Sequence, residues 1–142
     1  MFRVTKELAF CFGHRLLHYP GKCRQLHGHN ARAVVTVAGD ELNANGMLTD
    51  FSQLRRHVGD WIDRTLDHKL VLHQDDPLVP VLRDMGDPVL AIPDHPTTEN
   101  LAKFIFEQVQ EQGYPVVEVT LWETPTSYAT YTPAGLAAVV GD

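Results

Sequence analysis

The chain has 142 residues, of which 44% are hydrophobic and 21% charged, a size and composition typical of one globular domain. We therefore expect a single domain over residues 1–142. The formal net charge is −6, from 12 Lys plus Arg against 18 Asp plus Glu, which argues against nucleic acid as the main partner. No apolar run reaches the roughly 20 residues of a membrane span, and the first ten residues lack the features of a signal peptide. We expect a cytoplasmic protein without a membrane partner.

The first half of the chain predicts two strands followed by a helix. From Phe2 to Phe12 the even-numbered positions are almost all apolar, which indicates a half-buried strand. The β-branched run from Arg32 to Ala38 predicts a second strand, antiparallel to the first. Asp50 can then cap a helix whose apolar residues recur at helical spacing and which ends near Leu66.

The middle of the chain is rich in proline. Residues 67–96 contain five prolines, so we expect mostly loop, with one short turn around residues 79–82. Regular structure then resumes, because Thr97 or Thr98 can cap a second helix with apolar residues along one face.

Two short segments, 116–123 and 127–132, predict a closing hairpin. The order of elements is therefore ββααββ. The fold class predicted from this order is α+β, an antiparallel four-stranded sheet with two helices on one face.

The densest chemical signal is the sequence CRQLHGHN. His27 and His29 are two positions apart, so in an extended segment both imidazoles project to the same side. If the two strands pair, His14 at the end of the first strand comes alongside them. Three histidines leave one position open on a tetrahedral zinc ion, as in catalytic zinc sites. The alternative is that each histidine makes an ordinary hydrogen bond.

The two cysteines are expected to be free thiols. Cys23 precedes the histidine pair and allows two interpretations, a fourth zinc ligand or a free thiol beside the metal. Lys22 and Arg24 flank it, and positive charge favours the thiolate that a base or nucleophile needs. Cys11 lies within the first predicted strand, where we expect it to be a small packing residue.

Three further residues are candidates for chemistry. Asp67 and His68 follow the first predicted helix, either as a solvated helix end or as a proton relay near a thiol and a metal. Glu123 shares strand parity with Leu121 and is therefore directed toward the buried face. A buried carboxylate needs a partner, which can be an Arg or backbone group, or a ligand with two adjacent N–H donors.

Six motifs in this order, spread over almost the whole chain, resemble the 6-pyruvoyl-tetrahydropterin synthase / 6-carboxy-tetrahydropterin synthase family: FGHRL, CRQLHGHN, GMLTDF, LDHKL, TTEN and WET. The resemblance implies the tunnelling fold, in which ββααββ subunits join their sheets into a barrel, usually as a homo-hexamer of two stacked trimers. It also implies that the pterin pocket lies between subunits.

The resemblance assigns three groups of site residues. The zinc ligands would be His14, His27 and His29. The catalytic thiol and its partner pair would be Cys23, Asp67 and His68. The residues that hold the pterin would be Glu123, Thr97 and Thr98.

The implied activity is that of a zinc-dependent lyase acting on 7,8-dihydroneopterin triphosphate. A cysteine in the pattern Cys-x-x-x-His-Gly-His is mostly found in the branch that forms 6-carboxy-tetrahydropterin for queuosine synthesis, with loss of acetaldehyde and triphosphate. The alternatives are the 6-pyruvoyl product, or a zinc-binding homologue that acts on another pterin or is not catalytic. Arg15, Lys22 and Arg24 are candidates for contacting the triphosphate.

Overall fold

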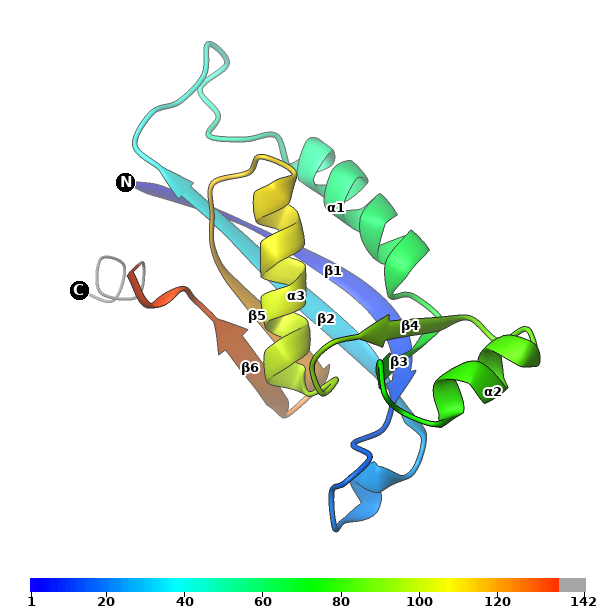
Figure 1. Cartoon of the computed structure of the whole chain (residues 1–142). Coiled ribbons are helices and arrows are strands. Elements are labelled where there is room, and N and C mark those ends of the chain that lie inside the picture. Colours follow the sequence, from blue (N-terminus) through cyan, green and yellow to red (C-terminus); the bar gives the residue numbers. More distant parts are fainter. Residues whose placement is uncertain (136–142) are drawn as a thin grey trace.

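The computed structural model describes residues 1–135 (Figure 1). Its sheet has six strands in the order β4-β3-β1-β2-β5-β6. In chain order the strands are β1 (Phe2–His14), β2 (His27–Gly39), β3 (Lys69–His73), β4 (Val89–Ile92), β5 (Val116–Thr124) and β6 (Ser127–Tyr131). The helices are α1 (Phe51–Thr65), α2 (Leu78–Asp84) and α3 (Thr98–Glu111). Within residues 1–135, no helix is both long and apolar enough to cross a membrane.

A long antiparallel hairpin of β1 and β2 forms the centre of the sheet. The two strands pair over their full length, from Phe2 opposite Gly39 to His14 opposite His27. Both strands are longer than the sequence predicted, because the alternation continues through polar histidines that an apolar pattern does not count. The even-numbered residues of β1 and the odd-numbered residues of β2 share one face.

That face carries the main hydrophobic core, and α1 and α3 cover it (Figure 1). Both helices begin where the sequence predicted. The Asp50 side chain accepts a hydrogen bond from the Ser52 N–H at 2.8 Å, and the Thr97 hydroxyl accepts one from the Asn100 N–H at 3.2 Å. Thr97 is thus the cap of α3, and Thr98 is its first helical residue.

The predicted four-stranded antiparallel sheet with two helices is wrong in strand count, strand direction and helix count. The sheet is mixed, because β3 runs parallel to β1 and β4 runs parallel to β3. Helix α2 is a third helix, and it packs Val79 and Leu82 against Leu72 of β3. The closing hairpin of β5 and β6 and the α+β class are confirmed.

Helix α2 and strand β4 escaped prediction because prolines lie at their ends. Pro77 caps α2 and Pro80 lies in its first turn, where a missing N–H costs little. Pro88 directly precedes β4 and Pro93 directly follows it. In this segment prolines therefore mark both ends of one short strand and the start of a helix.

Candidate metal centre and substrate pocket

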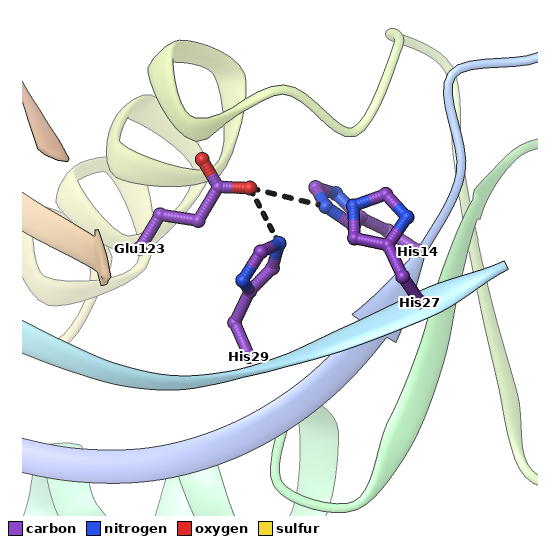
Figure 2. Close-up of side chains that lie close together, drawn as sticks. All are labelled: His14, His27, His29 and Glu123. Atoms are coloured by element: carbon purple, nitrogen blue, oxygen red, sulfur yellow. Dashed lines mark ion pairs between the residues drawn. The ribbon is translucent and has the colours of Figure 1, made fainter. Parts of the chain in front are cut away.

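Three histidines converge at the end of the β1–β2 hairpin (Figure 2). His14 ends β1, and His27 and His29 begin β2, all on the helix-covered face. Their ring centroids are 4.6 to 5.1 Å apart. With Glu123 of β5 they form a group whose candidate ligand atoms all lie within 4.8 Å of one another.

Backbone carbonyls fix the orientation of two of these rings. The Nδ1 atoms of His14 and His27 lie 2.7 Å from the carbonyl oxygens of Pro96 and Gln25, respectively. A carbonyl oxygen only accepts, so each Nδ1 carries a proton, and Nε2 is the ring nitrogen that could bind a metal ion. The Nε2 atoms of His14 and His29 are buried and have no partner in hydrogen-bond geometry. Such unpaired ring nitrogens fit a metal ion, and nitrogen and carboxylate donors in this number suit zinc.

Glu123 links this centre to the start of α3. Its Oε1 lies 2.7 Å from Nε2 of His29 and 3.2 Å from Nε2 of His14, while its Oε2 accepts a hydrogen bond from the Thr98 hydroxyl at 2.7 Å. The contact with His14 is the main cause that lowers the pKa of Glu123 to about 2, and the Thr98 hydrogen bond adds to it. Burial lowers the pKa of His29. The centre therefore contains an ionised carboxylate in contact with two of the imidazoles.

The sequence pattern correctly directed Glu123 toward the helix-covered face. Its contacts with histidines were not predicted, because parity on one strand does not say which strand lies beside it. The register of β5 against β2 places Leu121 opposite Ala33, so Glu123 follows toward the histidine end of the hairpin.

Cys23 lies in the short 3-10 turn Lys22–Arg24, close to the histidines but outside their ligand group. It is half-buried and lines a pocket of about 530 Å³ together with Lys22 and His27. Of the two interpretations left open by the sequence, this arrangement agrees with a free thiol beside the centre.

Asp67 and His68 lie beside the edge of β1 at Cys11. The Cys11 N–H donates to Oδ1 of Asp67 at 3.0 Å, and the His68 N–H donates to the Cys11 carbonyl at 2.7 Å. Nδ1 of His68 lies 2.9 Å from Oδ2 of Asp67. The Cys11 N–H is the main cause that lowers the pKa of Asp67. Asp67 thus orients an imidazole whose side chain is 78% exposed.

The sequence predicted that Cys11 is a small packing residue, and the structure groups its thiol with Asp67 and His68. Cys11 is odd-numbered, so its side chain lies on the face of β1 opposite to that of the buried residues Phe10 and Phe12. A pocket of about 560 Å³ is lined by Cys11 and His68, and it shares Leu26 and His27 with the pocket of Cys23. The two pockets are therefore neighbours.

Arg15 forms a salt bridge with Asp76 of the same chain. Its Nε donates a hydrogen bond to Oδ2 of Asp76 at 2.8 Å, and its Nη2 donates one to Oδ1. Asp76 also accepts a hydrogen bond from the Leu78 N–H at 2.8 Å. This pairing raises the pKa of Arg15 and lowers that of the buried Asp76. The expectation that Arg15 contacts a triphosphate is therefore not supported, and Lys22 and Arg24 remain.

The sequence model of the 6-pyruvoyl tetrahydropterin synthase family matches residues 3–134. The chain belongs to this family. Proteins named 6-carboxy-5,6,7,8-tetrahydropterin synthase are similar to it over nearly their whole length. The one from Synechocystis is 37% identical, covering 92% of this chain and 93% of the relative. The one from Haemophilus influenzae is 31% identical, covering 92% and 99%.

Solved structures show the same fold. An uncharacterized protein from Wolinella succinogenes superposes with a TM-score of 0.78 at 26% identity, covering 93% of this chain and 98% of that one. The 6-pyruvoyl tetrahydropterin synthase of Caenorhabditis elegans superposes with a TM-score of 0.68 at 28% identity, covering 94% and 98%.

Proposed function

We propose that this family member is a cytoplasmic zinc-dependent lyase of the queuosine pathway. It converts 7,8-dihydroneopterin triphosphate and one water into 6-carboxy-5,6,7,8-tetrahydropterin, acetaldehyde and triphosphate. The observation that carries the proposal is the meeting of three histidines with free or orphaned Nε2 atoms beside an ionised carboxylate and a thiol-lined pocket. The names of the relatives support the carboxy-forming reaction.

His14, His27 and His29 would hold the zinc ion. When bound, zinc would supply a Lewis acid to the oxygen atoms of the substrate side chain. The carbonyls of Pro96 and Gln25 support this role, because each fixes a ring with Nε2 directed away from the backbone.

Glu123 would anchor the pterin ring. An ionised carboxylate can accept two hydrogen bonds at once, which matches the adjacent ring N–H and exocyclic amine of a pterin. The low pKa of Glu123 keeps it ionised at neutral pH. Thr98 fixes the rotation of the carboxylate through its hydrogen bond to Oε2, and Thr97 lies at the edge of the same site as the cap of α3.

Cys23 and the Asp67–His68 pair would transfer the protons. Cys23 would take a proton from the substrate side chain, and His68 would return one, while Asp67 holds its Nδ1. Within one chain Cys23 and His68 line two adjoining pockets, and we propose that a neighbouring copy completes the relay.

The open edges of the sheet support such an assembly. In residues 1–135, only Phe12–His14 of β1 pair with β3, so the earlier part of this edge of β1 has no strand beside it. At the other end of the sheet lies β6. A strand edge with unpaired backbone N–H and carbonyl groups can pair with a strand of another chain. We propose a homo-hexamer of two trimers in which these edges join.

Product identification tests the function. Zinc-loaded protein is incubated anaerobically with dihydroneopterin triphosphate, and the products are identified by mass spectrometry. We expect 6-carboxy-tetrahydropterin with acetaldehyde. A 6-pyruvoyl product would contradict the carboxy-forming assignment, and the absence of any product from zinc-loaded protein would contradict the lyase itself.

The Cys23→Ala variant tests the role of the thiol in the same assay. It should keep its zinc and lose turnover. Loss of zinc would instead make Cys23 a ligand.

A further inference from the structure

A second group of metal-binding side chains lies on the other face of β1. The candidate ligand atoms of Cys11, Asp67 and His68 all lie within 4.8 Å of one another. Because side chains alternate along a strand, Cys11 points away from the face that carries His14 and the first centre. The two groups therefore share a strand but not a face.

Backbone hydrogen bonds hold this second group in place. The chain leaves α1, and Asp67 and His68 are tied to β1 through the N–H and the carbonyl of Cys11. His68 has a φ of 60°, a left-handed conformation that is uncommon for a residue with a Cβ. The hydrogen bonds with Cys11 keep the residue in that conformation, so thiol, carboxylate and imidazole stay together.

The donor set and its surroundings suit a borderline divalent metal ion. A thiol, an imidazole and a carboxylate are the ligand types of zinc and cobalt sites. In a tetrahedral site of this kind neighbouring ligand atoms are about 3.3 to 3.6 Å apart, so small side-chain rotations would close the group. The pocket of about 560 Å³ beside Cys11 and His68 gives an ion access and leaves room for a fourth ligand.

We propose that Cys11, Asp67 and His68 form a second divalent metal site, separate from the three-histidine centre. A metal ion there occupies Asp67 and His68 and removes the pair from proton transfer. Excess zinc therefore inhibits turnover. Only this inhibition rests on the proposed function, since the binding itself needs no pterin.

Cobalt titration of the metal-free full chain tests the site, because cobalt bound to a thiolate gives a charge-transfer absorption. We expect two equivalents per chain, with the thiolate absorption arising from one of them. Cys11→Ser should lose this absorption and weaken the second equivalent by about tenfold or more, whereas the matched control Cys23→Ser should keep both. Asp67→Asn, of nearly the same shape, should weaken the second equivalent and leave the first unchanged.

Binding of only one equivalent would overturn the proposal, as would thiolate absorption that survives in Cys11→Ser. Thermal unfolding of each variant shows whether it is folded, so lost binding is not mistaken for lost structure. If two equivalents bind and no pterin is converted, the second site stands and the proposed function fails.

Discussion

The carboxylate of Glu123 touches two histidines and a threonine hydroxyl, and a pterin anchor and a metal ligand would use these contacts differently. Glu123→Gln keeps the shape and removes the charge. If Glu123 is the pterin anchor, this variant should raise KM by about tenfold or more, because it loses a charge-assisted hydrogen bond to the substrate. Its metal content should be unchanged. Metal analysis and steady-state kinetics on the same sample check this.

Glu118→Gln is the matched control, because Glu118 lies on the same strand at a position of opposite parity and pairs with Arg3. Its KM and its metal content should equal those of the unmodified chain. Loss of metal in Glu123→Gln alone would make Glu123 a fourth ligand and contradict its role as the anchor.

Asp76 is a second residue with a direct prediction, because it holds Arg15 and the first turn of α2 while buried. Asp76→Asn should lower the free energy of unfolding by about 3 kcal/mol at pH 7. The folded-state pKa of Asp76 lies below its unfolded value of about 3.9. Its contribution is therefore complete above that value and is lost as the pH falls through the folded pKa.

Denaturant unfolding between pH 7 and pH 2 measures this difference, which should shrink below about pH 4. Asp75→Asn serves as the control, since the neighbouring Asp75 side chain is 83% exposed. A difference that stays constant down to pH 2 would contradict the stabilising ion pair.

Some of these residues could be predicted from the sequence, and others could not. The His-x-His spacing fixes which side of a strand two imidazoles share, and strand pairing adds His14. The Arg15–Asp76 pair spans 61 positions, and no local pattern connects its members. The grouping of Cys11 with Asp67 and His68 could not be predicted either, because these residues are distant in the sequence.

At the scale of elements, Gly59 in α1 offers a test of how the helix packs. A Cβ at this position would lie 3.7 Å from Cδ2 of Leu8, which is ordinary contact. Gly59→Ala should therefore raise the free energy of unfolding by roughly 0.5 to 1 kcal/mol, because alanine favours the helix. Thermal or denaturant unfolding measures the change.

Gly113→Ala is the opposing control. Its φ of 95° is strained for any residue with a side chain, so this variant should be destabilised. Destabilisation by Gly59→Ala would show that α1 packs more closely on β1 than the structure has it.

Elements with a clear period of their own were predictable, and elements without one were not. The β1–β2 hairpin, α1, α3 and the closing hairpin each carry their own pattern over several turns or alternations. Strands β3 and β4 have five and four residues and exist because they pair with strands already in place. That stabilisation comes from distant residues, so the local sequence does not show it.

At the scale of the whole molecule, the open edge of β1 leads to a prediction about assembly. Sedimentation analysis should give a mass six times the 15.9 kDa of one chain, with trimers as the smaller species on dilution. A monomer at micromolar concentration would contradict the joined edges and the relay between copies.

The central claim is that three histidines hold a metal ion on which pterin conversion depends. The most direct test measures the initial rate of product formation from dihydroneopterin triphosphate while zinc is added back to metal-free protein. We predict no product without zinc and a rate that rises in proportion up to the first equivalent per chain. Full activity of the metal-free protein, or no activity at one equivalent of bound zinc, would contradict the account.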